Sequence, residues 1–251
     1  MDFYIYNGYH IDDNSERTQR DPEMKNIKIY GDSILKGVMY NESLGRYKLC
    51  SYRFDDIEEN GIAIENNCKM GATVDKGFEI IKDTLDDCDK DTVVVLEYGG
   101  NDCNFDWSAV SAEPDRTDFL PATPAERFVK TYREMIEYCR SKGATVVVSS
   151  LVPIESGRFM NFVSKGLSYD NILKWLGDVN TISRWQEYYS SLVEKLARSM
   201  NCPLLDLRSE FLLPHRLDNM ICVDGIHPNA DGHSLIREIF MRSFADASIP
   251  V

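Results

Sequence analysis

The sequence has no apolar run that approaches the roughly 20 residues needed to cross a membrane, and it is poor in positive charge. Only 28 Lys and Arg stand against 41 Asp and Glu, which gives a formal net charge of −13. Because such a charge repels phosphate backbones, nucleic acid is a poor candidate partner. Residues 1–11 are aromatic and acidic and lack the basic start and small-residue cleavage site of a signal peptide. We therefore expect a cytoplasmic protein without a membrane span.

The cysteines and histidines also lack the spacings of a disulfide framework or a metal site. The seven cysteines form no CxxC pair and no Cys/His spacing typical of a metal site, and an odd number cannot all pair. We expect reduced, mostly buried thiols. The chain has four histidines, and no third ligand is near Asp224 and His227 in the sequence, so we expect no metal site there.

Apolar, β-branched runs alternate with stretches of helical period, which is typical of a parallel sheet covered by helices on both faces. A chain of 251 residues suits one such α/β domain. The predicted strands are 27–30, 62–65, 92–98, 144–149 and 203–207. The predicted helices include 123–143, with Thr123 as a capping box and Pro124 at the first helical position, 181–200, and a last helix from Pro228.

Two regions do not follow this alternation. Residues 1–26 begin with aromatic side chains and continue into a polar run, so we expect an N-terminal arm. The arm would pack on its own domain or reach a second subunit, as in a homodimer. Residues 152–180 are too long for a simple connection and carry several aromatic residues, so we expect an insertion or a lid within the domain at 27–251.

Ser33 lies in Gly31-Asp32-Ser33, directly after the first predicted strand. That position predicts a turn at the carboxyl edge of the sheet, where open α/β sheets bind ligands. A serine becomes a nucleophile when a base takes its proton. The alternative interpretation is that Ser33 caps a following helix.

The best candidate base for Ser33 is His227. Asp224 lies three residues earlier with a glycine between, so its carboxylate can hold Nδ1 and leave Nε2 for the serine. The alternative is a helix-start turn with a solvated histidine. The remaining histidines, at positions 10, 215 and 233, are predicted to be surface or packing residues.

Acyl transfer also needs hydrogen-bond donors directed at the developing oxyanion. The backbone N–H groups of Ser33 and Gly71 and the side-chain amide of Asn101 are the candidates. Gly71 precedes a predicted helix capped by Thr73, and Asn101 follows the third strand after two glycines. The alternatives are a turn that requires positive φ at Gly71 and an Asx turn at Asn101.

In their order along the chain, these segments resemble the blocks of the SGNH hydrolase family, also called the GDSL esterase/lipase family. The four residues of that name would be Ser33, Gly71, Asn101 and His227, with Asp224 as the acid of the triad. The resemblance extends from about residue 27 to residue 244. It implies a flavodoxin-like three-layer α/β/α sandwich around a five-stranded parallel sheet, and ester hydrolysis without a metal or an organic cofactor.

The expected substrate is a small-molecule ester, with a short acyl group on a carbohydrate or another small polar alcohol. A lysophospholipase or thioesterase type of acyl hydrolase is the alternative. Two further alternatives keep the fold: an acyltransferase that uses the same serine, and a binding module without turnover.

Overall fold

The computed structural model describes residues 25–54, 58–59, 62–89 and 91–245. Nearly all of the arm predicted at residues 1–26 lies outside these ranges. Lys25 and Asn26 already belong to the first strand, so the sheet begins two residues earlier than expected. Whether the arm reaches a second subunit stays a prediction.

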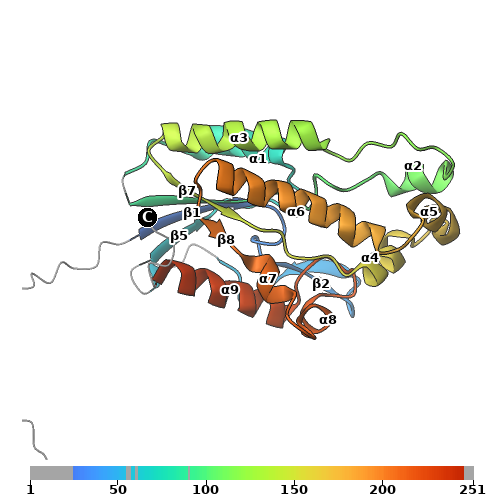
Figure 1. Cartoon of the computed structure of the whole chain (residues 1–251). Helices are drawn as coiled ribbons and strands as arrows, with labels where there is room; N and C mark the ends of the chain where they lie inside the picture. The colour runs from blue at the N-terminus through green and yellow to red at the C-terminus, as the bar shows by residue number, and fades with distance from the viewer. Residues whose placement is uncertain (1–24, 55–57, 60–61, 90, 246–251) are drawn as a thin grey trace, which may run out of the picture.

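Five parallel strands form the centre of the molecule (Figure 1). They are β1 (Lys25–Gly31), β5 (Ile62–Asn66), β6 (Thr92–Glu97), β7 (Thr145–Ser149) and β8 (Leu204–Leu205). Their order is β5-β1-β6-β7-β8, and the two-residue β4 (Glu58–Glu59) pairs antiparallel at the β5 edge. This order is that of flavodoxin-like folds, so the predicted fold class is confirmed. β8 is the one strand that is much shorter than predicted.

Helices cover both faces of the sheet, and the side chains of β6 show why. Val94 and Leu96 pack in the core beneath α1 (Val74–Thr84), α3 (Ala125–Ser141) and α6 (Thr181–Ser199). Val93 and Val95 pack in a second core, against α7 (Leu207–Phe211) and α9 (Ala230–Ala245). Because alternate residues of a strand point to opposite faces, a continuously apolar strand requires cover on both sides. Figure 1 shows these helices above and below the sheet.

Two helix starts differ from the sequence prediction. α3 begins at Ala125 after Pro124, and no side chain caps it, so the capping box predicted at Thr123 is wrong. Instead, the backbone N–H of Thr123 donates to the carbonyl of Asp102. Pro228 forms a β-bridge with Ile221 and lies outside the last helix.

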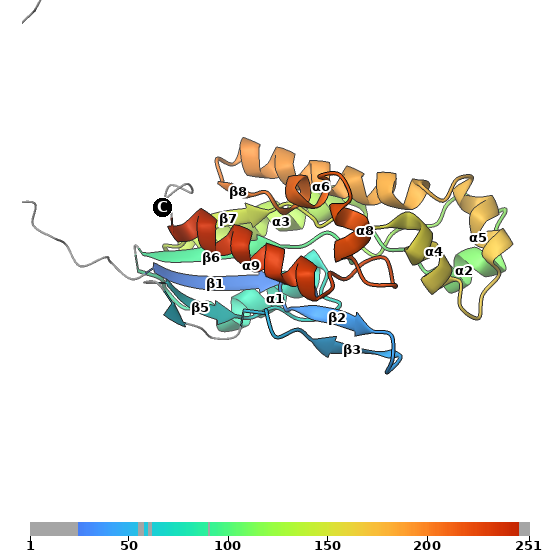
Figure 2. The ribbon, with the colours of Figure 1, turned by 90° about the horizontal axis from the view of Figure 1, so that it is seen from below.

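The segment after Ser33 is an antiparallel hairpin and not a helix. A turn over 33–37 leads into β2 (Val38–Asn41) and β3 (Arg46–Leu49), which pair with each other and not with the main sheet. Figure 2 shows the hairpin projecting beyond the main sheet. The interpretation of Ser33 as a helix cap is therefore wrong.

Short helices occupy the carboxyl end of the sheet, at the right of Figure 1. The region 152–180 forms α4 (Ser156–Val163) and α5 (Tyr169–Leu176), and α5 packs against α2 (Trp107–Ala112) around a third apolar cluster. α8 (Arg216–Met220) lies in the connection from α7 to α9. Residues 152–180 thus contain two short helices, while their role as an insertion or a lid stays a prediction.

All seven cysteines are among the described residues; they are free thiols, and six are buried. In the part of the chain that the structure describes, no helix is long and apolar enough to cross a membrane. The same ranges contain no group of three or more His, Cys, Asp or Glu side chains that could hold a metal ion.

Candidate active site

Ser33 lies at the carboxyl end of β1, where the sequence predicts it. The turn is held by its neighbour Asp32, whose Oδ1 accepts a hydrogen bond from the Ile34 N–H at 2.8 Å. The carbonyl of Ser33 accepts a bond from the Val38 N–H at 2.9 Å, which joins the turn to the hairpin. The Ser33 side chain is 6% exposed and lines a cavity.

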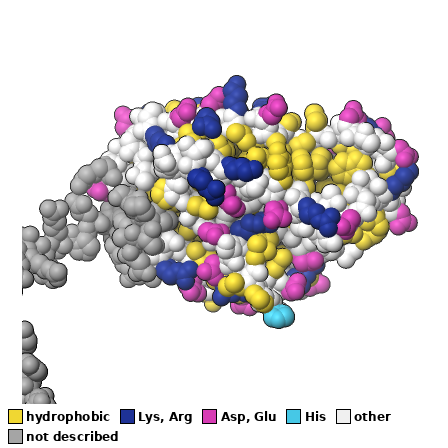
Figure 3. All heavy atoms as spheres, viewed as in Figure 1, with side chains coloured by type: hydrophobic (Ala, Val, Ile, Leu, Met, Phe, Trp, Pro, Cys, Tyr) yellow, Lys and Arg dark blue, Asp and Glu magenta, His cyan; other side chains and the backbone are white. Residues whose placement is uncertain are grey.

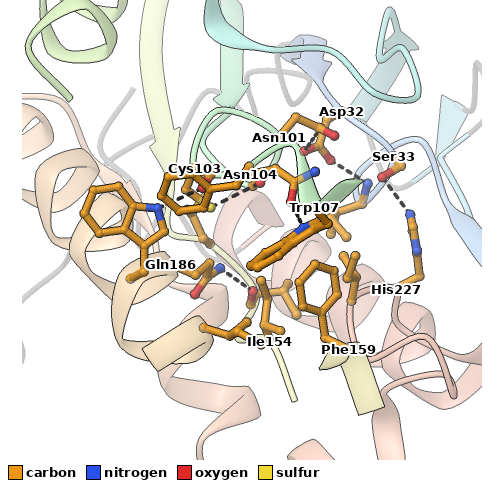
Figure 4. A pocket seen from close by; sticks show the side chains of 18 of the residues that line it. Asp32, Ser33, Asn101, Cys103, Asn104, Trp107, Ile154, Phe159, Gln186 and His227 are labelled. Atoms are coloured by element: carbon orange, nitrogen blue, oxygen red, sulfur yellow. Dashed lines mark hydrogen bonds between the residues drawn. The ribbon is translucent and has the colours of Figure 1, made fainter. Parts of the chain in front are cut away.

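Ser33, His227 and Asp224 form one chain of hydrogen bonds (Figure 4 shows the serine and the histidine). His227 Nε2 is 2.9 Å from Ser33 Oγ, and His227 Nδ1 is 2.6 Å from Asp224 Oδ2. Because a carboxylate accepts hydrogen bonds, Nδ1 carries the ring hydrogen and donates a hydrogen bond to Asp224 Oδ2. Nε2 is then the acceptor that faces the serine hydroxyl, which is the arrangement of a nucleophile and its base.

The loop that carries Asp224 and His227 is held rigidly. Asp224 Oδ1 accepts hydrogen bonds from the N–H groups of Ile226 and His227, at 3.2 and 3.1 Å. Gly225 has φ +77°, and its carbonyl accepts a bond from the Glu155 N–H at 2.9 Å, immediately before α4. The carboxylate thus fixes both the backbone of the loop and the imidazole ring. The alternative of a solvated histidine at a helix start is wrong, since His227 is 5% exposed.

The three candidate oxyanion donors differ in whether they already have hydrogen-bond acceptors within the protein. The N–H groups of Ser33 and Gly71 donate to no acceptor in the described ranges. Asn101 Nδ2 donates to Asp32 Oδ2 at 2.8 Å and to the Ala72 carbonyl at 3.1 Å. Both amide hydrogens of Asn101 therefore have acceptors within the protein. The bond to Ala72 also ties the Asn101 segment to the loop of Gly71.

Gly71 has φ +74°, the left-handed conformation that favours glycine, and no atom lies within 4 Å of the position of a Cβ. The loop stays close to the first strand because the Lys69 N–H donates to the Gly31 carbonyl at 3.0 Å. Thr73 caps α1 as predicted. Gly71 thus has the positive φ named among the alternatives, and its backbone N–H donates to no acceptor in the described ranges.

A buried carboxyl group beside Asp32 is the main feature that the sequence analysis missed. Glu97 ends β6, is 2% exposed, and accepts a bond from the Asp32 N–H at 3.3 Å. Burial raises the pKa of Glu97 well above its ordinary value, and the charge of Asp32 raises it further. Burial raises the pKa of Asp32 as well, and hydrogen bonds from the Ile34 N–H and from Asn101 oppose that rise. The signal in the sequence was a glutamate at the end of an otherwise apolar strand.

Asp102, next to Asn101, has a second positioning contact. Its two carboxylate oxygens accept from the Val74 N–H, at 3.0 and 3.2 Å, at the start of α1. Burial raises the pKa of Asp102 from 3.8 to about 6. Asn101 and Asp102 together therefore hold the segment from Ala72 to Val74, which joins Gly71 to α1.

The hairpin contributes an aromatic side chain to the site. The ring of Tyr47 in β3 lies 5.0 Å from the His227 ring, centroid to centroid, at an interplanar angle of 59°. Tyr40 in β2 contacts both Tyr47 and Phe162 of α4 edge to face, at 5.3 and 5.2 Å. Burial raises the pKa of Tyr47 to about 12, so its hydroxyl is neutral. The hairpin thus covers the histidine from one side.

Of the other histidines, His215 is exposed and His10 lies outside the described residues. His233 is buried in α9, and its Nε2 donates to the Val38 carbonyl at 2.9 Å. It is a packing residue, as predicted.

A cavity of about 320 Å³ opens beside Ser33 and His227 (Figure 4). It extends between the short helices and α6, and its walls are largely aromatic and aliphatic. The apolar lining residues include Phe105, Trp107, Ile154, Phe159, Trp175, Leu176, Ile182 and Trp185. We call this cavity the apolar chamber.

Comparison with known proteins gives the family of this chain. The sequence model of the GDSL-like Lipase/Acylhydrolase family matches residues 29–235. The chain belongs to this family, and it is a carboxylic ester hydrolase. A comparison with curated proteins gives no match.

Solved structures with the same fold are distant in sequence. One is a lipase/acylhydrolase from Enterococcus faecalis, 17% identical, covering 89% of this chain and 96% of its own, with a TM-score of 0.54. A second is the acetyl xylan esterase AlAXEase, 19% identical over 87% and 98%, with a TM-score of 0.55. A third is a mutant of Axe2, an acetyl-xylooligosaccharide esterase from Geobacillus, 15% identical over 87% and 93%, with a TM-score of 0.56.

Proposed function

We propose that the protein is a serine esterase that hydrolyses a carboxylic ester through an acyl-enzyme on Ser33. The observation that carries the proposal is the continuous hydrogen-bonded chain from Ser33 Oγ through His227 to Asp224. The nucleophile, the base and the group that orients the base each stand in the position that their role requires.

In the first half of the reaction, His227 Nε2 takes the proton of Ser33 while Oγ attacks the ester carbonyl carbon. The bond to the alcohol oxygen then breaks, and Nε2 returns the proton to that oxygen. In the second half, water repeats these steps on the acyl-enzyme and releases the carboxylic acid and free Ser33. Asp224 accepts the Nδ1–H bond throughout and stabilises the imidazolium ion.

The oxyanion would be bound by the N–H groups of Ser33 and Gly71 and by Asn101. Support comes from the two backbone N–H groups, which have no other acceptor in the described part of the chain. Asn101 would have to share one amide hydrogen between an existing acceptor and the oxyanion, as in a three-centre hydrogen bond. We therefore assign the larger share of oxyanion stabilisation to the backbone donors.

Two substrates are candidates. A short acyl group on a carbohydrate or a similar polar alcohol is supported by the names of the acetyl xylan and acetyl-xylooligosaccharide esterases that share the fold. A longer, apolar acyl group is favoured by the apolar chamber beside the serine. No cofactor or metal takes part in either proposal, and the donor groups of the site are those of the protein.

The test is hydrolysis of p-nitrophenyl esters, from acetate to palmitate, by the wild type and by Ser33→Ala. Ser33→Ala should lower kcat by about 10⁶-fold, because it removes the hydroxyl that faces His227 Nε2. The matched control is Ser199→Ala, which removes an exposed hydroxyl at the end of α6 and should leave the rate unchanged. Circular dichroism shows whether each variant is folded. Wild-type activity in folded Ser33→Ala would refute the proposal.

A second assay distinguishes hydrolysis from acyl transfer. Products are analysed with and without a sugar or another acceptor alcohol. The free acid should remain the main product when the acceptor is present. Transfer of most of the acyl group to the acceptor would identify an acyltransferase.

A further inference from the structure

The walls of the apolar chamber are built from aromatic rings that hold one another in place. Phe105 contacts Trp107, Trp175 and Trp185, with ring centroids 6.0, 5.0 and 5.6 Å apart. On the other side, Trp107 packs edge to face against Phe159 of α4 at 5.7 Å. The chamber is thus a preformed cavity whose shape depends on ring packing.

The wall reaches the molecular surface along α6. Trp185 stacks on Tyr188, with ring centroids 5.5 Å apart, and Tyr188 is 42% exposed. Figure 3 shows hydrophobic side chains gathered on this side of the molecule, toward the end that carries α2. An apolar path therefore connects the surface with the chamber wall.

Most polar groups on the inner wall already bond within the protein. The indole N–H groups of Trp107 and Trp185 donate to Asn104 Oδ1 and to the Cys103 carbonyl, both at 2.8 Å. The Thr181 hydroxyl donates to the Leu176 carbonyl at 3.0 Å.

Gln186, the most deeply buried of these polar residues, uses both ends of its amide. Nε2 donates to the Val152 carbonyl at 2.8 Å, and Oε1 accepts from Arg208 Nη1 at 2.9 Å. The amide is therefore fixed by the fold and does not turn toward the cavity. Little hydrogen-bonding capacity is left for a bound molecule.

These contacts distinguish a sugar from an alkyl chain. Each sugar hydroxyl that enters the chamber without finding a partner loses its hydrogen bonds to water, at a cost of about 1–3 kcal/mol. An alkyl chain has no such cost and gains from burial, about fourfold in binding for each methylene. The chamber therefore selects an apolar group.

The volume sets the size of that group. A methylene is comparable in size to a water molecule, whose share of liquid volume is about 30 Å³. A cavity of about 320 Å³ thus holds roughly ten such groups, including those next to Ser33. An acetyl group would leave most of it unfilled.

The order of the reaction assigns the chamber to the acyl part of the ester. The alcohol leaves first, and water must then reach the acyl carbon before His227 can act again. A group enclosed among α2, α5 and α6 suits the part that remains bound through both half-reactions. A leaving alcohol suits the side where it can exchange with water.

We propose that the apolar chamber binds the acyl chain of the substrate, a saturated or unsaturated chain of about six to ten carbons. This inference depends on the proposed function, since it assumes that Ser33 forms the acyl-enzyme. It extends that function by naming the acyl length, and it replaces the short acyl group expected from the sequence.

The experiment measures kcat/KM for p-nitrophenyl esters with acyl chains of two to sixteen carbons. The leaving group is constant, so the series varies only the acyl part. We expect kcat/KM to rise by up to about fourfold per methylene, to reach its maximum at about six to ten carbons, and to fall beyond it. A maximum at acetate, with the activity lost in Ser33→Ala, would overturn this inference and leave the proposed function standing. No hydrolysis above that of Ser33→Ala at any length would overturn both.

A substitution that fills the chamber provides the second test. Leu176→Trp adds volume at a half-buried position of the wall and should move the maximum to shorter chains. The matched control is Leu213→Trp, which makes the same change at an exposed leucine before α8 and should leave the profile unchanged. Equal profiles for both folded variants and the wild type would show that the acyl chain lies elsewhere.

A series with the acyl part held constant tests the assignment to the acyl chain. Ethyl, butyl and octyl acetates vary only the alcohol. We expect their kcat/KM values to agree within about threefold. An alcohol that stays outside the chamber should gain less binding free energy from its added carbons than one buried methylene provides. A steep rise with alcohol length, together with a flat acyl series, would place the alcohol in the chamber and overturn the assignment.

Discussion

His233→Gln should change how the stability of the protein depends on pH. His233 lies in α9, is 3% exposed, and donates from Nε2 to the Val38 carbonyl at 2.9 Å. Burial, opposed by the hydrogen bond to Val38 and aided by the nearby His227, lowers its pKa from 6.5 to about 4. Between these two values the unfolded chain binds a proton at this histidine and the folded chain does not.

The sign and size of the effect follow from that difference in bound protons. Where the unfolded state binds more protons, the free energy of unfolding falls as the pH falls. From pH 7, His233 alone should remove about 2 kcal/mol by pH 5 and about 3 kcal/mol by pH 4. Its stabilising contribution is complete above pH 6.5 and is lost as the pH falls toward 4.

Other buried groups titrate in the same pH range, so the assay must compare the unfolding free energies of two proteins that share those groups. The raised pKa of Asp102, about 6, has the opposite sign: stability increases as the pH falls through 6 toward 3.8. Urea unfolding of the wild type and of His233→Gln, measured from pH 7 to pH 4, cancels the groups that both proteins share. Gln can still donate to the Val38 carbonyl without titrating.

The difference between the two unfolding free energies should be about 2 kcal/mol smaller at pH 5 than at pH 7. His215→Gln, at an exposed histidine, is the matched control for the loss of a histidine and should not reproduce this convergence. Parallel curves for the wild type and His233→Gln would refute the reasoning. In that case the imidazole would take up its proton in the folded state.

Three further substitutions test the site. Asp224→Asn should lower kcat by about 10⁴-fold, which is less than the roughly 10⁶-fold loss expected for His227→Ala, because the imidazole remains and only its orientation is lost. Equal losses of kcat in steady-state assays of the two variants would contradict this. Gly225→Ala should unfold the loop or displace it, since its Cβ would lie 2.3 Å from the Phe159 backbone N at φ +77°; a wild-type melting temperature with full activity would show otherwise. Tyr47→Leu should lower kcat by about two- to tenfold, and Tyr47→Phe should not, because the ring packs on the imidazole; equal rates for all three proteins would refute that role.

Local sequence patterns predicted most of the fold. The apolar runs of β6 and β7 predicted central strands because a parallel strand buried on both faces must be apolar throughout. α6 was predicted almost to the residue, since its apolar side chains repeat at helical spacing. Those signals lie within single segments, and packing confirms them without change.

The signals that failed were those that depend on partners far along the chain. The hairpin of β2 and β3 follows Ser33 where a helix start was the alternative, and no local motif marks it. It is stabilised by distant contacts, such as those of Val38 with His233 and of Tyr40 with Phe162. Pairing between residues well over a hundred positions apart leaves no periodic signal in either segment.

The sequence by itself determined which chemical groups the site contains. It supplied Ser33, Gly71 and Asn101 after strands β1, β5 and β6, which end at one edge of a parallel sheet, and it supplied Asp224 three residues before His227. Since the carboxyl ends of parallel strands meet at the same edge, the sequence predicts that Ser33, Gly71 and Asn101 lie close together.

Only the tertiary structure decided how those groups are held and what surrounds them. The raised pKa of Glu97 depends on its burial beside Asp32, and burial is a property of the packed molecule. The apolar chamber arises where α2, α5 and α6 meet, from residues about 80 positions apart. Local sequence specifies the candidate reacting groups, because each was recognised from a residue type and its neighbours within one segment. The substrate-binding volume is specified by long-range packing, which no single segment encodes.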